Sequence, residues 1–252
     1  MNIKEIEIHP GHWINPGSGA IGILNEVTEA RKVAKRVYEI LKASNVPCTY
    51  YEDNTSTNQR QNINNLVNQH NKDRDGLIVS IHLNSGGDGS KAIGTEVLYY
   101  DQQALAARIS KAISDATGGD LPNRGAKQRK DLGVLASTYE PAILIEACFV
   151  NSVVDAAVYR RDFEKICYAI ANELAKHIGK SLKAPTPPKT EDKKEEQKMT
   201  NSLTSTGKED LKGLLKETHK RGILKVDHSD RVGSMTDGEA LSLLISVVKR
   251  TL

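Results

Sequence analysis

The sequence predicts a three-layer α/β domain, with helices on both sides of a mostly parallel sheet, followed by a small, mainly helical C-terminal domain. Over residues 1–180, apolar runs typical of strands alternate with apolar positions at helical spacing. Beyond residue 180, a stretch rich in proline and charge separates this region from two further helical patterns. The 252 residues are 38% apolar, which is enough for one ordinary domain with a buried core and a small second one.

The first half of the α/β region begins with a strand at 3–8, in which Ile6 and Ile8 alternate with charged residues before a Pro-Gly break presents His12. Seven apolar residues at helical spacing, from Val27 to Leu41, predict a helix that Asn25 can cap. A short strand at 46–51 and a polar helix at 59–71 follow. The continuous apolar run at 77–83 then predicts a central strand covered on both faces.

The second half continues with a strand at 94–100 and a helix at 103–117, after a Gly/Ser loop at 85–90. Residues 118–131 are polar and contain glycine, so we expect a loop there. Short apolar runs predict the last two strands at 132–136 and 141–149, and closing helices are expected at 153–159 and 162–178. In such sheets ligands bind at the carboxyl ends of the strands, where His12 and His82 would lie.

The C-terminal part divides into a linker at 181–200 and a small domain at 201–252. The linker is too polar to bury and is partly extended by proline. Two capping-box patterns, Thr206 with Glu209 and Thr236 with Glu239, precede apolar helical runs and predict helices at 209–221 and 237–250. A unit this small has little core, so we expect it to gain stability by association with itself, the first domain or a target.

Composition excludes several functions. The net charge of +3 is modest and arises beyond residue 180, without the dense basic face and interleaved aromatics of nucleic-acid binders, but it is compatible with a polyanionic surface such as a cell wall. No stretch approaches the roughly 20 apolar residues of a membrane span, so we expect no membrane insertion. The cysteines Cys48, Cys148 and Cys167 are odd in number and lack C-x-x-C spacing, which indicates synthesis in a reducing compartment.

Three residues are candidate metal ligands, because two imidazoles and one carboxylate make a zinc site that leaves a fourth position for water or substrate. Each has an ordinary alternative. His12 follows a glycine in a loop and could be a surface residue, and Glu26 at a helix start could serve the helix dipole. His82 interrupts an apolar strand, where burial of an unpartnered ring is costly, but it could be a satisfied core histidine.

Glu146 lies inside the apolar strand Ala142–Phe149, where a carboxylate must be paired, protonated or bound to a cation. No flanking residue provides a buried basic partner, which favours a general base whose pKa is tuned by burial and a nearby metal. Cys148, two residues further on, is expected on the same strand face and is a candidate thiol nucleophile, although a small buried filler is the ordinary interpretation.

These residues together resemble the zinc-dependent N-acetylmuramoyl-L-alanine amidases, especially those of phage or prophage endolysins. The resemblance is carried by the segments Ile8-His9-Pro10-Gly11-His12, Glu26 at a helix start, Ser80-Ile81-His82-Leu83-Asn84 and Leu144–Asn151 with Asp155. Gly94–Tyr100 and Arg124–Lys127 are also similar to segments of that family. The segments occur in matching order and cover essentially all of residues 1–180.

The resemblance implies an α/β fold with a six-stranded sheet, one Zn²⁺ held by His12, Glu26 and His82, and Glu146 as the catalytic carboxylate. It implies cleavage of the amide that joins muramic acid to the L-alanine of the peptidoglycan stem. We expect Asn84, Arg124 and Lys127 to contact substrate, with Arg124 or Lys127 as donors to the oxyanion. Two departures are His9, where relatives often carry Asp, and Trp13-Ile14 in place of Gly-Gly. We expect His9 to support the site from behind the ligands.

The tail resembles the small wall-targeting module of some Bacillus phage amidases, through Gly222–Ser229. This implies a two-part lysin that binds peptidoglycan and secondary wall polymers, with a plain helical or homo-oligomeric appendage as the alternative.

We expect synthesis in the host bacterial cytoplasm without a signal peptide and release by another factor. Met199 is a candidate internal translation start. Alternative functions are a zinc peptidase acting within the stem peptide, a Cys148-based hydrolase and a non-catalytic wall-binding protein.

Overall fold

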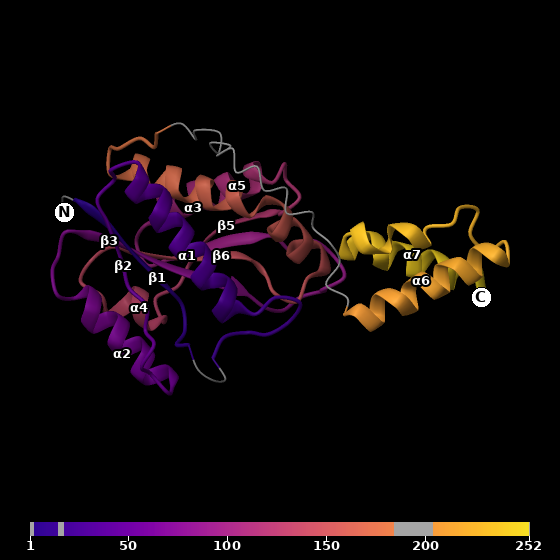
Figure 1. The fold of residues 1–252 in the computed structure, drawn as a ribbon. Coiled ribbons are helices and arrows are strands. Elements are labelled where there is room, and N and C mark those ends of the chain that lie inside the picture. The colour runs from indigo at the N-terminus through magenta and orange to yellow at the C-terminus, as the bar shows by residue number, and fades with distance from the viewer. Residues whose placement is uncertain (1–2, 15–17, 184–203, 252) are drawn as a thin grey trace. The chain divides into compact units, whose positions relative to one another are not determined.

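The computed structural model describes residues 3–14, 18–183 and 204–251 (Figure 1). The chain separates into two compact units, residues 1–186 and 187–252. The expected linker at 181–200 lies outside the described residues except for 181–183, and the candidate start at Met199 also lies outside them. No helix of the described ranges is long and apolar enough to cross a bilayer.

The first unit is built on one six-stranded sheet with the order β2-β1-β3-β6-β4-β5. The strands are β1 (Glu5–Pro10), β2 (Cys48–Tyr50), β3 (Gly76–Asn84), β4 (Thr95–Tyr99), β5 (Asn123–Gln128) and β6 (Ala142–Phe149). The first four strands in this order are parallel, whereas β4 runs antiparallel to β6, and β5 is parallel to β4. The carboxyl ends of β1, β3 and β6 therefore share one edge with the amino ends of β4 and β5.

Helices cover both faces of the sheet, as the sequence predicts (Figure 1). The larger core joins one face to α1 (Glu26–Ala43), α3 (Gln103–Ala116) and α5 (Val153–His177). The smaller core joins the other face to α2 (Gln59–His70) and α4 (Gly133–Ser137). Successive residues of β3 point to opposite faces of the sheet, so they pack alternately into the two cores. Val79 and Ile81 belong to the larger core and Ile78 to the smaller one.

Two expectations about the elements are wrong. Residues 132–136, expected as a strand, form most of helix α4, because a short apolar run does not distinguish a strand from a buried helix. The missing strand is β5, which lies in the expected loop. As an edge strand it needs no apolar face and carries polar side chains. The two expected closing helices both form, and they are continuous as one element, α5, with a kink at Asp162 where the backbone angles are non-helical.

The second unit contains α6 (Ser205–Lys220), the 3-10 helix η1 (Ser229–Ser234) and α7 (Asp237–Thr251) around a core of its own. The capping box of α7 forms as predicted, because Thr236 N and Glu239 N bond to each other's side chains at 2.8 and 3.2 Å. The box predicted at Thr206 does not form. The Thr204 side chain caps α6 instead, by accepting a bond from Gly207 N, so the helix begins earlier than expected.

Candidate active site

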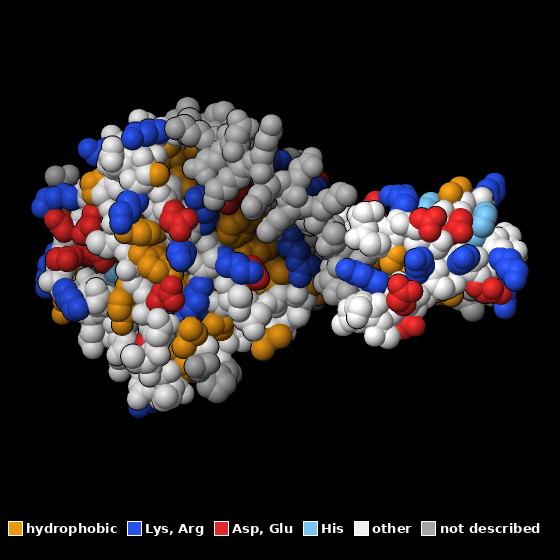
Figure 2. All heavy atoms as spheres, viewed as in Figure 1, with side chains coloured by type: hydrophobic (Ala, Val, Ile, Leu, Met, Phe, Trp, Pro, Cys, Tyr) orange, Lys and Arg blue, Asp and Glu red, His pale blue; other side chains and the backbone are white. Residues whose placement is uncertain are grey.

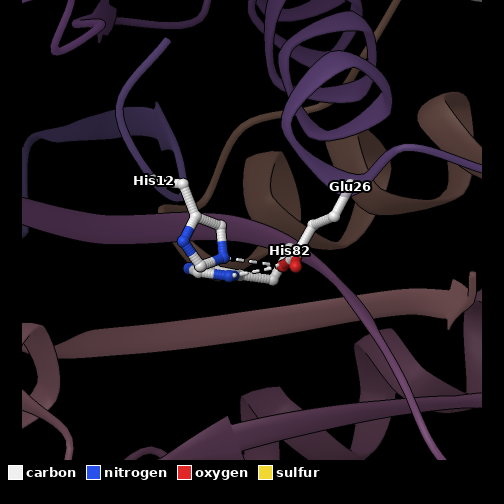
Figure 3. Close-up of side chains that lie close together, drawn as sticks. All are labelled: His12, Glu26 and His82. Atoms are coloured by element: carbon white, nitrogen blue, oxygen red, sulfur yellow. Dashed lines mark hydrogen bonds and ion pairs between the residues drawn. The ribbon is translucent and has the colours of Figure 1, made fainter. Parts of the chain in front are cut away.

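His12, Glu26 and His82, separated widely in the sequence, meet at the carboxyl edge of the sheet (Figure 3). His12 follows β1, Glu26 is the first residue of α1, and His82 is near the end of β3. The Glu26 Oε1 atom lies 3.0 Å from His12 Nε2 and 2.9 Å from His82 Nδ1. One donor atom from each residue lies within 4.8 Å of the other two, so the three side chains could hold one metal ion.

The Pro10-Gly11-His12 turn places the first imidazole by close backbone packing. A Cβ on Gly11 would overlap the ring of His82, so only glycine allows the turn to pass this close to β3. His12 itself has a positive φ of 64°, a conformation that costs energy for a residue with a side chain. Two hydrogen bonds hold the turn: Gly11 N donates to Ile81 O at 2.7 Å, and Arg31 Nη2 donates to His12 O at 3.2 Å.

Glu26 is buried and fixed through both carboxylate oxygens. Ala20 N donates to Oε2 at 2.7 Å, and Leu83 N donates to Oε1 at 3.3 Å. Burial acts to raise the pKa of Glu26, but hydrogen bonds from His12 and His82 outweigh it and bring this pKa well below its ordinary value. The carboxylate is therefore ionised, which is the form that binds a cation.

The His82 imidazole favours its neutral form. Burial lowers the pKa of His82, and the Glu26 carboxylate opposes this shift only in part. A neutral imidazole has a nitrogen lone pair free for a metal, whereas an imidazolium does not. The set of two imidazoles and one carboxylate fits zinc, which takes nitrogen and oxygen donors and keeps a position open in hydrolytic sites.

Glu146 lies in β6 directly opposite His82 of β3, and its side chain projects from the same face of the sheet. On its other side it is opposite Glu96 of β4. Its Oε2 atom is buried and accepts no hydrogen bond from the described residues. Burial, followed by repulsion from Glu26 and Glu96, raises the pKa of Glu146 to about 8. This carboxyl group is suited to exchange a proton near neutral pH.

Glu96 is a site residue that sequence analysis missed. Its Oε1 accepts a bond from Asn84 Nδ2 at 3.0 Å, and its Oε2 accepts one from Arg124 Nε at 2.7 Å. The Arg124 guanidinium also lies over the ring of Phe149, 5.0 Å from its centroid. Glu96 thus fixes two residues predicted to contact substrate. The signal that singled out Glu146, an acid inside an otherwise apolar strand, is present here too.

Lys127, predicted to contact substrate, is three residues beyond Arg124 along β5. It is exposed and lies opposite Leu98 in the register, further from the site edge. Among the described residues no hydrogen bond or ion pair joins Lys127 to this cluster, so the structure brings Arg124 and Asn84 to the site but not Lys127.

His9 is inside β1 and fully buried, and it does not join the three candidate ligands. Its Nδ1 lies 2.8 Å from His70 Nε2, and His70 Nδ1 lies 2.5 Å from Glu7 Oε2. The chain Glu7–His70–His9 thus runs between β1 and α2, behind the turn that carries His12. Burial lowers the pKa of His9 well below its ordinary value, so its imidazole favours the neutral form.

Cys148 does not share a face with Glu146, contrary to expectation. The β3–β6 register shifts between His82 and Asn84, and this bulge turns Cys148 into the larger core with Ile143 and Ile145. Burial raises the pKa of the Cys148 thiol well above its ordinary value. The thiolate is disfavoured, so the position is that of a buried filler rather than a nucleophile.

The fold and this cluster define an α/β domain with a group of potential metal ligands at the carboxyl ends of its strands. Residues 6–183 match the family model described as N-acetylmuramoyl-L-alanine amidase. The chain therefore belongs to the N-acetylmuramoyl-L-alanine amidase family.

Two curated relatives come from Clostridium perfringens, and both are uncharacterised. A 38.4 kDa protein is 32% identical over 73% of this chain and 54% of its own length, and a second protein is 27% identical over 92% and 64%. The present chain thus spans between about half and two thirds of the relatives that it matches.

Solved structures of amidase domains are similar to the first unit. The catalytic domain of the CD27L endolysin targeting Clostridia Difficile has a TM-score of 0.61 and 25% identity, over 71% of this chain and 99% of that one. The catalytic domain of CwlV, an N-acetylmuramoyl-L-alanine amidase from Bacillus (Paenibacillus) polymyxa, has a TM-score of 0.57 and 28% identity, over 70% and 99%. AmiC2 of Nostoc punctiforme, another N-acetylmuramoyl-L-alanine amidase, has a TM-score of 0.58 and 26% identity, over 70% and 97%.

Proposed function

We propose that this protein hydrolyses the amide between N-acetylmuramic acid and the L-alanine of the peptidoglycan stem, using one zinc ion held by His12, Glu26 and His82. The observation that carries the proposal is the convergence of these three donor atoms one strand away from Glu146, in a domain of the amidase family. A bound zinc ion would polarise the scissile carbonyl and lower the pKa of a water molecule at the site.

Glu146 supplies the proton transfers. It accepts a proton from the attacking water and returns it to the nitrogen of the departing L-alanine, which is a poor leaving group unless protonated. A general base must be ionised before attack. Burial is the main cause of the raised pKa of Glu146, and a cation beside Glu26 would offset the repulsion from that carboxylate, which is the second cause. The site therefore couples metal binding to the charge of its base.

Arg124 and Asn84 bind polar groups of the substrate in this proposal. Both are fixed by Glu96, which is 8% exposed and anchored in β4, so their donors are oriented before substrate arrives. Arg124 is the stronger candidate for stabilising developing negative charge, because its guanidinium has donors beyond the Nε atom bonded to Glu96.

The second unit is proposed to bind the cell wall and hold the catalytic unit near its substrate. Four of its apolar side chains, at Val226, Leu241, Ile245 and Leu214, are at least 39% exposed, which favours contact with another surface, whether a wall polymer or a second copy of the unit. An endolysin role, in which the protein is made in the host bacterium and reaches the wall after release by a separate factor, accords with the similarity to the CD27L catalytic domain.

Digestion of purified peptidoglycan tests the proposed bond. The full chain should release free L-alanine amino termini without new reducing sugars, and Glu146→Gln should release neither. New amino termini from any other stem residue would favour a zinc peptidase and contradict the amidase. Activity that survives Glu146→Gln but not Cys148→Ser would favour the thiol mechanism, against which the burial of Cys148 already argues.

A further inference from the structure

Five carboxyl groups gather at the edge of the sheet opposite the candidate active site. Glu5 and Glu7 belong to β1, Asp73 and Asp75 to the loop between α2 and β3, and Glu140 lies just before β6. They form two groups that share Asp73, and within each group one oxygen per residue lies within 4.8 Å of the others. The parallel order of β1, β3 and β6 brings the amino ends of three neighbouring strands together here.

Burial distinguishes this cluster from an ordinary acidic surface. Glu7 is only 6% exposed and Glu140 only 4%. Glu7 Oε2 lies 2.5 Å from His70 Nδ1, and Glu140 Oε1 accepts a bond from Gly76 N at 2.6 Å. The remaining oxygens, Glu7 Oε1 and Glu140 Oε2, are buried without a hydrogen-bond donor among the described residues. Such unpartnered buried oxygens are costly, so they indicate a missing partner.

The two unpartnered carboxyl groups face each other. Glu7 and Glu140 lie within hydrogen-bond reach, and Glu7 interacts in the same way with Asp73. Gly76 makes this approach possible, because a Cβ at that position would overlap Glu7 Oε1. The buried oxygens are therefore directed into the cluster, where Asp73 joins the two groups.

Little positive charge from the described residues balances these acids. Lys4 pairs with Asp75 at 2.7 Å, but its side chain is largely exposed. The Arg74 guanidinium stacks on Tyr139, 4.2 Å from the ring centroid. Burial lowers the pKa of His70 to about 4, so this imidazole is neutral at physiological pH. Its Nδ1 and Nε2 are occupied by Glu7 and His9, so the donors left to a ligand are carboxylate oxygens.

We propose that this cluster, the acidic-edge site, binds a divalent cation of the calcium class, with Asp73 as the ligand that joins the Glu5–Glu7 pair to the Asp75–Glu140 pair. Oxygen-only donors from a loop and two strand ends suit Ca²⁺, which accepts six to eight oxygens in flexible geometry, better than Mg²⁺ or zinc. The cation satisfies both buried oxygens and removes the repulsion among the acids. Its role is structural, because it braces the Glu7–His70–His9 chain behind the His12 turn.

A proton shared by Glu7 and Glu140 is the competing occupant. Burial raises the pKa of each carboxyl group to about 7, and their mutual interaction couples the two. The charge of Asp73 would favour a shared proton, but this proton would be lost at alkaline pH. A bound cation would be retained there and would depend on Asp73, so the two occupants predict different behaviour.

Calcium titration of the zinc-loaded full chain at pH 8, after removal of contaminating calcium, tests the site. We expect saturable calorimetric binding of one Ca²⁺ and a thermal midpoint that rises with Ca²⁺ concentration. Asp73→Asn, an exposed loop substitution, and Glu140→Gln should each weaken binding at least tenfold. Asp115→Asn, an exposed acid of α3, is the matched control and should bind as the parent does.

The active-site variant His82→Ala separates this site from the zinc site, since it should retain Ca²⁺ binding after zinc is lost. The proposal is overturned if no saturable binding occurs at millimolar Ca²⁺, if Asp73→Asn binds as tightly as the parent, or if His82→Ala abolishes binding. A midpoint that is insensitive to Ca²⁺ but falls as pH rises through 7 in the parent, and not in Glu140→Gln, would identify the shared proton and equally overturn it.

Discussion

The Nδ1 atom of His82 lies 2.9 Å from Oε1 of Glu26, although the two residues are 56 positions apart in the chain. The same oxygen is 3.0 Å from His12 Nε2, so one carboxylate oxygen joins both imidazoles. We expect the purified protein to contain one zinc per chain, measured by atomic absorption. His82→Ala should lower that content to near zero, because two remaining ligands bind zinc weakly.

The substitution His9→Asn tests whether His9 supports the fold behind the site or is itself a zinc ligand. We expect this variant to retain its zinc, because His9 contacts His70 and lies outside the group of three donors. Its unfolding midpoint should fall, because the substitution breaks a buried hydrogen-bonded chain, at a cost of about 1–3 kcal/mol. Loss of zinc with an unchanged midpoint would instead make His9 a ligand. Zinc content and thermal unfolding, measured on the same preparation, separate the two.

Glu146→Gln should abolish hydrolysis without damaging the domain. Activity on purified peptidoglycan should fall by about 10²–10⁴-fold, the usual contribution of a general base. Zinc content should be unchanged, and the unfolding midpoint should not drop, because the amide removes a buried carboxyl group that has no hydrogen-bond donor at Oε2. A variant that loses zinc or unfolds early would show that Glu146 has a structural role instead.

Arg124→Ala should raise KM for peptidoglycan fragments, whereas Lys127→Ala should leave it close to the parent value. Arg124 is tied to the site through Glu96 and Phe149, but Lys127 is exposed further along β5. The ion pair with Glu96 is partly exposed, so we expect only a small loss of stability from Arg124→Ala. Equal effects of the two substitutions on KM would contradict the strand register, which places Arg124 at the site and Lys127 away from it.

Much of the site could be predicted from sequence, for a physical reason. Parallel strands bring their carboxyl ends to one edge, so His12 and His82 at the ends of two predicted strands had to lie near each other, and a buried acid such as Glu146 requires a function. Glu96 and Arg124 depend on the reversed direction of β4 and β5. Glu96 has the same signal as Glu146, an acid inside an apolar strand, but the sequence pattern of a strand does not encode its direction and so does not show that Glu96 lies beside Glu146 and Arg124.

The errors in the fold have similar causes. β5 lies at the edge of the sheet and most of its residues are exposed, so it has no apolar pattern typical of a strand. Helix α4 is too short for a helical period to show in its sequence. The acidic-edge site could not be predicted from the sequence, because its residues come from three separate segments. In each segment the acidic residues have the pattern of ordinary surface residues. His70 was part of an amphipathic helix pattern, and only the packing of α2 on β1 brings it to Glu7.

The acidic-edge site also predicts how stability depends on pH in calcium-free buffer. Burial raises the pKa of Glu140 from 4.5 to about 7 in the folded protein, so the folded state holds this proton more tightly than the unfolded state does. The stabilisation from this proton is fully present below pH 4.5 and is lost as pH rises through about 7. His70, whose pKa burial lowers, contributes in the opposite direction. Glu7, whose pKa burial also raises to about 7, contributes in the same direction as Glu140. In denaturant unfolding from pH 4.5 to 8 the parent should lose stability relative to Glu140→Gln, and parallel curves would refute the assignment.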